Sequence, residues 1–466
     1  MGEERAAQHW AGLGGGGLKV SYAILENLHR QGYISVLEEK RKKEEKPPTI
    51  QREKRKKKEE RESFPPYIVS GSSRIVYYGM DADEEILNAL KQGGLYREIL
   101  QKHERYLRFV AGRLAGTGGV FERVEHILEE YKEYVPIVRD IKDIFSQRTG
   151  VWIPFFSLDG GAGHGFFREH VKLIENGEIL QRTLEPPFIM PITIAPNKAD
   201  ANKDAKWPER GIYRKYAENV LIALDYIEGL MKGSHPIIDA CIVLDNDFSG
   251  FNALCNKELY DYDYVIEKVE PVITNGNFSQ WRTVGGYTMN DANDAIVNSV
   301  FPIFMMLLRA PQGTKFGKVG QMGFDHRDIK SSFSRKFVIP SHLSISHRYQ
   351  VGDILRDYSL EGINEELAYL AYYTFLISCA PLYLDNIENV MIFIWYKDFD
   401  IAGVAEDIRR EVAEVFGDTV EERNIEVHQV VGIRDPNATI KVWTFTGMDS
   451  MKEIMEKKLM LGGGGT

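Results

Sequence analysis

Residues 151–174 read VWIPFFSLDGGAGHGFFREHVKLI, and this stretch decides the fold. An apolar run leads into the glycine-rich segment Gly160–Gly165, and apolar residues with helical spacing follow, which predicts a strand, a turn and a helix. Glycines allow backbone N–H groups to face a single point, and the helix adds the positive end of its dipole. A segment of this kind suits a phosphate group.

Two further glycine-rich segments have the same place in the pattern. Residues 12–17 read GLGGGG and residues 116–119 read GTGG, and each enters a predicted helix. Several helix N-termini around one polyphosphate predict nucleotide binding more specifically than one glycine turn alone. No GxxxxGK[ST] phosphate loop occurs, and the acidic residue expected about 20 residues after a GxGxxG motif falls in or near a run of charges. NAD binding is therefore the minor alternative.

The wider pattern predicts an α/β fold. Strands alternate with helices over residues 1–290, which favours a parallel-sheet nucleotide-binding domain, interrupted by a charged insertion at about 38–62. A long helix is expected from Leu95 to about Leu114. Residues 291–330 are expected to hold a long, apolar central helix, Asp291–Arg309, and an acidic loop. A smaller α+β domain over residues 331–447 and a tail over residues 448–466, with a short helix, complete the expected organisation.

Composition narrows the class of protein. Lys and Arg number 58 against 68 Asp and Glu, a formal net charge of −10, which argues against a nucleic-acid partner. Three cysteines give no disulfide framework and suit a reducing compartment. The first residues lack the apolar centre of a secretory signal. We therefore expect a cytoplasmic protein.

Two segments leave alternatives open. Residues 367–384 form 18 residues without a charge, but four tyrosines and Pro381 favour a buried core helix over a transmembrane helix. The charge run Glu38–Glu62 is either a solvated loop or a mobile pair of charged helices, or else a contact arm for anionic lipid, nucleic acid or an acidic partner. Its mixture of both signs favours the solvated interpretation.

The ordered set of motifs resembles the tubulin and FtsZ superfamily of filament-forming GTPases, FtsZ-like proteins most closely. The family signature GGGTGSG stands here as Gly160–Gly165 after Asp159, and the segments GLGGGGLKV, YYGMDADEEIL and LAGTGGVFE resemble its other phosphate-side loops. The resemblance implies that GTP or GDP, with Mg²⁺, is bound by residues of these loops: Gly14, Gly15, Gly16, Lys19, Asp81, Gly116, Thr117, Gly118, Gly119, Gly160, Gly161, Ala162, Gly163, His164 and Gly165.

The resemblance extends to the base and the ribose. IDACIVLDND is similar to the strand that ends in Asp-Asn, so Asn246 would contact guanine. NDAIVNSVFPIFMMLLR aligns with the central helix of the family, so Asp294 would contact the base edge, and Tyr287 could stack on the base. Glu209 lies where a ribose contact is expected.

A second diagnostic segment, GQMGFDHRD over Gly320–Asp328, resembles the acidic synergy loop of FtsZ. Asp325 and Asp328 fall on its two acidic positions, which implies that one subunit inserts them into the nucleotide site of the next subunit in a head-to-tail protofilament. A carboxylate there can orient or deprotonate the attacking water, so GTP is hydrolysed at subunit junctions. Asp328 could instead cap a helix.

The departures from the family pattern keep two alternatives open. Ala162 replaces the usual Thr of the signature and Gly323 replaces an Asn of the acidic loop, so a nucleotide-binding scaffold with little turnover, acting at a membrane or in a complex, is the second hypothesis. His164 either contacts phosphate or fills space. Lys19 either contacts phosphate or lies on the solvent face of its helix.

Overall fold

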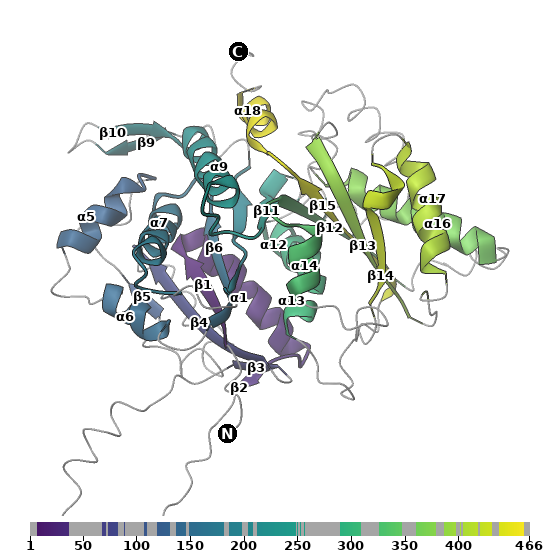
Figure 1. Ribbon diagram of the computed structural model, residues 1–466, viewed down its shortest axis with the longest axis horizontal. Coiled ribbons are helices and arrows are strands. Elements are labelled where there is room, and N and C mark those ends of the chain that lie inside the picture. The colour runs from purple at the N-terminus through teal and green to yellow at the C-terminus, as the bar shows by residue number, and fades with distance from the viewer. Residues whose placement is uncertain are drawn as a thin grey trace, which may run out of the picture.

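The structure is a computed structural model. Figure 1 colours its helices and strands in chain order, from purple at the N-terminus to yellow at the C-terminus. The structure describes residues 7–36, 68–70, 73–82, 88, 107–109, 119–130, 137–145, 149–180, 186–197, 204–207, 212–247, 249, 252, 256, 289–308, 326–346, 360–378, 386–397, 401, 404–417, 420–430 and 438–460.

Within these described residues, one sheet of 13 strands has the order β14-β13-β15-β12-β11-β8-β6-β1-β4-β3-β2, with β5 beside β4 and β7 beside β6. Its central strands are parallel, which confirms the predicted α/β class. The strands are β1 (Ala7–Leu13), β2 (Ser35–Val36), β3 (Ile68–Ser70), β4 (Ser73–Asp81), β5 (Leu107–Phe109), β6 (Thr149–Ser157), β7 (Phe188–Ile189), β8 (Ile192–Ala195), β11 (Cys241–Asp245), β12 (Phe337–Ser346), β13 (Ile387–Tyr396), β14 (Ile425–Gln429) and β15 (Ala438–Met448), while β9 (Asp204–Trp207) and β10 (Ile212–Lys215) form a separate pair.

Helices cover both faces of this sheet, and each face has its own apolar core. Successive strand residues point to opposite faces, so Trp152 and Phe156 of β6 join one core while Ile153 and Phe155 join the other. One core holds residues of α1 (Gly14–Arg30), α12 (Met289–Ser299), α13 (Phe301–Leu307) and α14 (His326–Ser332). The other holds residues of α5 (Glu122–Glu130), α6 (Ile137–Ile144), α7 (Gly161–Glu175), α9 (Tyr216–Lys232), α16 (Leu360–Leu376), α17 (Ala405–Phe416) and α18 (Lys452–Met460), and the 3₁₀ turn η7 (Glu422–Asn424) precedes β14.

The central strand β1 was not predicted, because polar residues occupy its first half. Gln8 and His9 are both buried. The Gln8 amide donates to the carbonyl of Leu307, and Nε2 of His9 lies 3.0 Å from the carbonyl oxygen of Ile144. Carbonyls of distant segments therefore offset part of the cost of burying these polar side chains.

The predicted central helix is interrupted. It is divided into α12 and α13 at Val300, because Pro302 has no N–H with which to bond the carbonyl of Asn298. The indole Nε1 of Trp443 donates to that carbonyl instead, at 2.8 Å. The C-terminal sheet therefore satisfies the acceptor that the helix itself leaves open.

Three further expectations change in detail. The helix expected from Leu95 to Leu114 is wrong at residues 107–109, which form β5 and pair in parallel with β4. Strand β12, which was not predicted, pairs with both β11 and β15, and so the sheet of the C-terminal region continues that of the N-terminal region. Residues 367–376 of the apolar stretch belong to α16, which begins earlier, at Leu360. None of the helices in the described ranges has both the length and the apolar character needed to span a bilayer.

Candidate functional site

Helices α1 and α7 begin side by side at the carboxyl ends of neighbouring parallel strands. The chain leaves β1 through α1 toward β4, whereas β6 lies on the other side of β1, so the direction of the sheet order reverses between β1 and β6. Ligands of open α/β sheets bind at such a reversal. The two helices belong to opposite faces, and their first turns meet above the ends of the two strands.

Glycine is required where these first turns meet. Gly14 has a positive φ of 67°, and a Cβ on it would lie 2.6 Å from the backbone nitrogen of Gly163. A Cβ on Gly163 would lie 2.6 Å from the carbonyl oxygen of Leu13. The predicted glycine turns at 12–17 and 160–165 are therefore in contact. Their glycines form the first turns of the helices, because α1 begins at Gly14 and α7 at Gly161.

The glycine turn at 116–119, the third, is linked to the turn at 160–165 through a side chain that was not predicted from the sequence. Asn219 of α9 is buried, and its Nδ2 donates to the carbonyl oxygens of Gly119, at 2.6 Å, and Asp159, at 2.9 Å. A Cβ on Gly165 would lie 2.7 Å from the carbonyl oxygen of Phe121, at the start of α5. The only sequence signal for Asn219 is a polar residue among the buried residues of α9.

The ring of His164 is completely buried. It stacks on Phe156, with ring centroids 6.3 Å apart, and packs against Phe121 and Tyr226 at 4.8 and 5.8 Å. These contacts support the space-filling interpretation of the His164 side chain and oppose the phosphate contact. The residue still contributes to the first turn of α7 through its backbone.

The N-termini of α1 and α7, called the joined helix ends from here on, have the polarity that an anion needs. Neither α1 nor α7 has an acidic residue in its first turn, although Asp159 directly precedes the N-cap of α7. Gly15 and Gly16 in α1, and Ala162 in α7, are half-buried in these first turns, and Gly160 is the N-cap of α7. The side chain of Lys19 is exposed on the second turn of α1, which fits its solvent-face interpretation.

Strand register places Asp81 near this pair of helix ends, and Asp159 directly precedes the N-cap of α7. Asp81 ends β4, directly after Met80, which is paired with Leu13 of β1. It is buried, and its Oδ1 accepts a hydrogen bond from the backbone N–H of Ala82, at 2.7 Å. Among the described residues no group of three or more His, Cys, Asp or Glu side chains could hold a metal ion. One carboxylate beside a phosphate site nevertheless fits Mg²⁺, which binds through one or two carboxylates, substrate phosphates and several waters.

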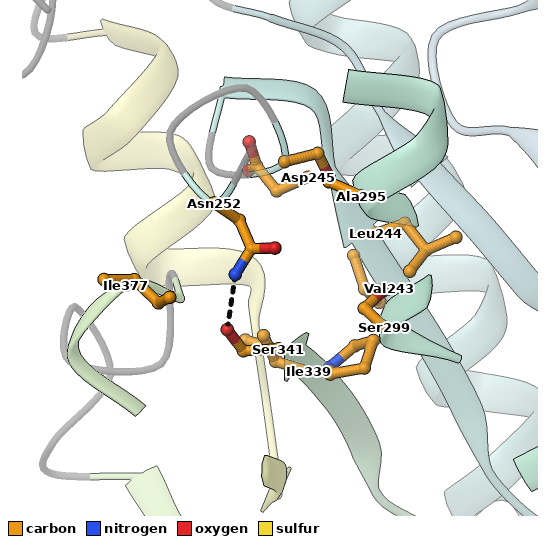
Figure 2. Close-up of a pocket in the computed structure, with 11 residues that line it drawn as sticks. Val243, Leu244, Asp245, Asn252, Ala295, Ser299, Ile339, Ser341 and Ile377 are labelled. Carbon is orange, nitrogen blue, oxygen red and sulfur yellow. Dashed lines mark hydrogen bonds between the residues drawn. The ribbon is translucent and has the colours of Figure 1, made fainter. Parts of the chain in front are cut away.

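Two residues predicted to bind the base, Asn246 and Asp294, are chain neighbours of residues that line one pocket at the end of β11. A small pocket with a volume of about 20 Å³, enough for about one water molecule, is lined by Asp245 of β11 and Ala295 of α12 (Figure 2). In the sequence, Asn246 directly follows Asp245, and Asp294 directly precedes Ala295. Asn246 is half-buried and Asp294 is exposed. Because β11 is two strands from β6, Asn246 and Asp294 lie about 10 Å from the joined helix ends, measured across the strands.

Helix α14, which contains Asp328, lies at the amino ends of the parallel strands, the edge of the sheet opposite to the joined helix ends. Its Lys330 forms an ion pair with Asp239, at 2.7 Å, and Asp239 precedes the amino end of β11. The backbone N–H of Cys241 bonds to the carbonyl of Lys336, which follows α14. A strand of five to seven residues therefore separates α14 from the joined helix ends, a distance of about 20 Å.

Several predicted site residues fall outside the described residues, and their assignments stay predictions. They are Gly116, Thr117, Gly118, Glu209, Tyr287 and Asp325, and the side chain of Asp328 is likewise not described.

Comparison with known proteins gives the fold a name. No family profile matches the sequence, and no curated protein is significantly similar to it. Among solved structures, CetZ from Methanosaeta thermophila strain DSM 6194 is similar, with a TM-score of 0.51 over 97% of this chain and 90% of that chain, at 12% sequence identity. CetZ is a protein of the tubulin/FtsZ superfamily. An identity this low carries the fold and no more, and the chain thus has the α/β fold found in the tubulin/FtsZ superfamily.

Proposed function

We propose that the protein binds GTP at the carboxyl edge of its sheet and hydrolyses it at junctions between subunits of a head-to-tail filament. The observation that carries this proposal is the contact between Gly14 and Gly163, which joins two helix N-termini with no acidic residue in their first turns at the reversal point of the sheet. Two aligned sets of backbone N–H groups suit a polyphosphate better than one.

Each group of residues would have a separate part in binding. The first turns of α1 and α7 hold the phosphates, and Asn219 fixes the third glycine turn against the second. Asp81 would hold Mg²⁺, whose charge stabilises the transferred phosphoryl group. Asn246 and Asp294 read the base, at the distance along the sheet that an extended nucleotide needs.

The position of α14 supports hydrolysis between subunits. Because α14 and the joined helix ends occupy opposite edges of one sheet, Asp328 cannot reach the phosphate site of its own chain. If two copies stack with these opposite ends of the sheet in contact, α14 of one would face the phosphate site of the other. Asp325 and Asp328 would then orient or deprotonate the attacking water. Such an assembly is expected in the cytoplasm, which the cysteine usage supports.

The first test measures GTP binding and phosphate release by the purified full chain across a range of protein concentrations. We expect turnover per subunit to rise steeply with concentration, because an isolated subunit has an incomplete site, and electron microscopy with GTP should show filaments. Asp325→Ala should retain GTP and lose turnover. Turnover per subunit that stays constant on dilution would reject the shared site, and bound GTP without phosphate release would select the scaffold hypothesis.

A mixing experiment tests the shared site directly. Asp325→Ala subunits keep the phosphate site, and subunits with Asn246→Ala and Asp294→Ala keep the acidic loop. Each variant alone should be inactive, whereas a mixture should recover part of the activity, because some junctions then combine two intact halves. A mixture no more active than its components would contradict hydrolysis between subunits.

A further inference from the structure

The C-terminal helix α18 places a cation at the end of β11. Nζ of Lys458 lies 2.6 and 2.5 Å from the two carboxylate oxygens of Asp245 and 2.9 Å from Oδ2 of Asp247. The side chains of Lys458 and Asp245 are only 9% and 1% exposed. These two carboxylates are the immediate neighbours of Asn246 in the chain. One lysine, supplied by a helix at the far end of the sequence, therefore fixes the turn that contains the predicted base-reading residue.

The electrostatics make this turn dependent on its cation. Burial raises the pKa of Asp245, and the Lys458 ammonium opposes that shift. Burial disfavours the ammonium of Lys458, but the charges of Asp245 and Asp247 outweigh it and raise its pKa. Oδ1 of Asp245 also accepts the backbone N–H of Asp247, at 3.0 Å. Without Lys458, the buried carboxylate of Asp245 would lack its counter-ion. The turn would then have to rearrange, or Asp245 would have to take up a proton.

The surrounding contacts hold α18 and the turn in fixed positions. Met455 and Leu459 of α18 are buried in the core that also contains residues of α9. On the far side of the turn, Nδ2 of Asn252 donates to Oγ of Ser341, at 3.1 Å, and to the carbonyl of His342, at 2.8 Å, as Figure 2 shows for Ser341. The turn after β11 is thus attached to α18 at its start and to β12 farther along.

We propose that Lys458 is a positioning residue for the base pocket, so that recognition of guanine depends on the docking of the C-terminal helix. The proposal rests on the proposed function, because it concerns the base end of the same site. It assigns α18 to the nucleotide site, although no residue of α18 lies in a glycine turn or in the acidic loop. The phosphate end, two strands away, is independent of this ion pair.

The test compares the binding of GTP and of inorganic tripolyphosphate by calorimetry. In the full chain, Lys458→Met should weaken GTP binding at least about tenfold and change tripolyphosphate binding less than about twofold. Lys452→Met is the matched control, because Lys452 belongs to the same helix but pairs with Asp225 in an exposed ion pair, at 2.6 Å. The double variant with Asp245→Asn and Lys458→Met should recover most of the GTP affinity, since Asp247 is exposed enough to remain hydrated.

Each outcome decides between the two proposals. A folded Lys458→Met protein with wild-type affinity for GTP overturns the role of Lys458 and leaves the proposed function intact, whereas a wild-type protein that binds no GTP overturns both. If Lys458→Met fails to fold, hydrogen exchange of the wild-type chain supplies the answer. GTP should then slow exchange in residues 241–247 and in α18 together, and unchanged exchange in α18 overturns the inference.

Discussion

The backbones of Gly14 and Gly163 touch, so that neither residue has room for a Cβ. This contact brings together the first turns of two helices that lie on opposite faces of the sheet, and it fixes how closely both helices approach the strand ends. The proposed phosphate site depends on this approach, because N–H groups bind an anion only when they point at the same position.

We expect Gly163→Ala to destabilise the protein and to abolish GTP binding. Its methyl group would lie 2.6 Å from the carbonyl oxygen of Leu13 and 3.0 Å from Cβ of Phe156, so α7 must move, at a cost of about 1–3 kcal/mol. The matched control is Gly229→Ala, where a Cβ has nothing within 4 Å and a helical alanine should add up to about 1 kcal/mol. Denaturant unfolding and GTP titration measure both effects. Wild-type GTP affinity in Gly163→Ala would contradict the proposed phosphate site.

Asn219→Ala should loosen the third glycine turn. The substitution removes the donor to the buried carbonyls of Gly119 and Asp159, which should lower the free energy of unfolding by about 1–3 kcal/mol and weaken GTP binding. Asn176→Ala serves as the control, because that side chain bonds only to exposed Glu178, at 3.3 Å, and should change stability by less than about 0.5 kcal/mol. Equal losses in the two variants would show that the bridge made by Asn219 is not specific.

Stability should fall in mild acid because of buried histidines. Burial lowers the pKa of His9 and of His170 to about 4, although each ring also bonds to a backbone carbonyl. A folded-state pKa below the unfolded value of 6.5 means that this contribution is complete above pH 6.5 and is lost as the pH falls toward 4. The free energy of unfolding, measured by urea titration at several pH values, should therefore decline over this window.

His170→Phe tests that origin. The ring of His170 stacks on Trp152, with centroids 5.5 Å apart, and a phenyl ring preserves this shape while it removes the titrating group. The variant should resemble the wild type above pH 7 and should be more stable near pH 4 by an amount on the order of 3 kcal/mol. An unchanged pH profile would assign the acid sensitivity to other groups.

Asp239→Ala should separate turnover from nucleotide affinity. Asp239 holds α14 through Lys330 and accepts the backbone N–H of Ile189, at 2.8 Å, so its loss should displace the helix that contains Asp328. We expect phosphate release to fall severalfold while GTP affinity stays within about twofold, because the phosphate site lies about 20 Å away at the other edge. Lys336→Ala is the control. It removes an ion pair with Glu388 that spans 3.8 Å and is partly exposed, and such a pair contributes little. A loss of affinity in Asp239→Ala would contradict the separation of the two edges.

The sequence predicted the parts of the fold whose signals are local. The apolar run, glycines and helical spacing around Gly160–Gly165 correspond to β6 and α7, and the parallel α/β class followed from the alternation of such units. The glycine turns at 12–17 and 160–165 were expected to lie together because each enters a predicted helix, and several helix N-termini can surround one polyphosphate. The side-chain interpretation of His164 stayed open in the sequence, since only the three-dimensional structure shows the aromatic rings around it.

The features that were missed depend on distant partners. Strand β1 reads as polar, and its buried Gln8 and His9 bond to the distant carbonyls of Leu307 and Ile144. Strand β12 contains Pro340 and His342, which are unusual in a central strand, and the ring of His342 packs on Trp443, 5.2 Å away. The role of Asn219 likewise depends on two carbonyls that lie 60 and 100 positions away.

The continuous sheet has a mechanical consequence for any head-to-tail assembly. Its parallel strands run from the edge with α14 to the edge with the joined helix ends, and hence from one junction toward the next. Tension along such a polymer would load covalent backbone lengthwise, in several strands that share the load through their lateral hydrogen bonds. Strain would then concentrate at the contacts between subunits, and a filament under load should break at its junctions before any subunit unfolds.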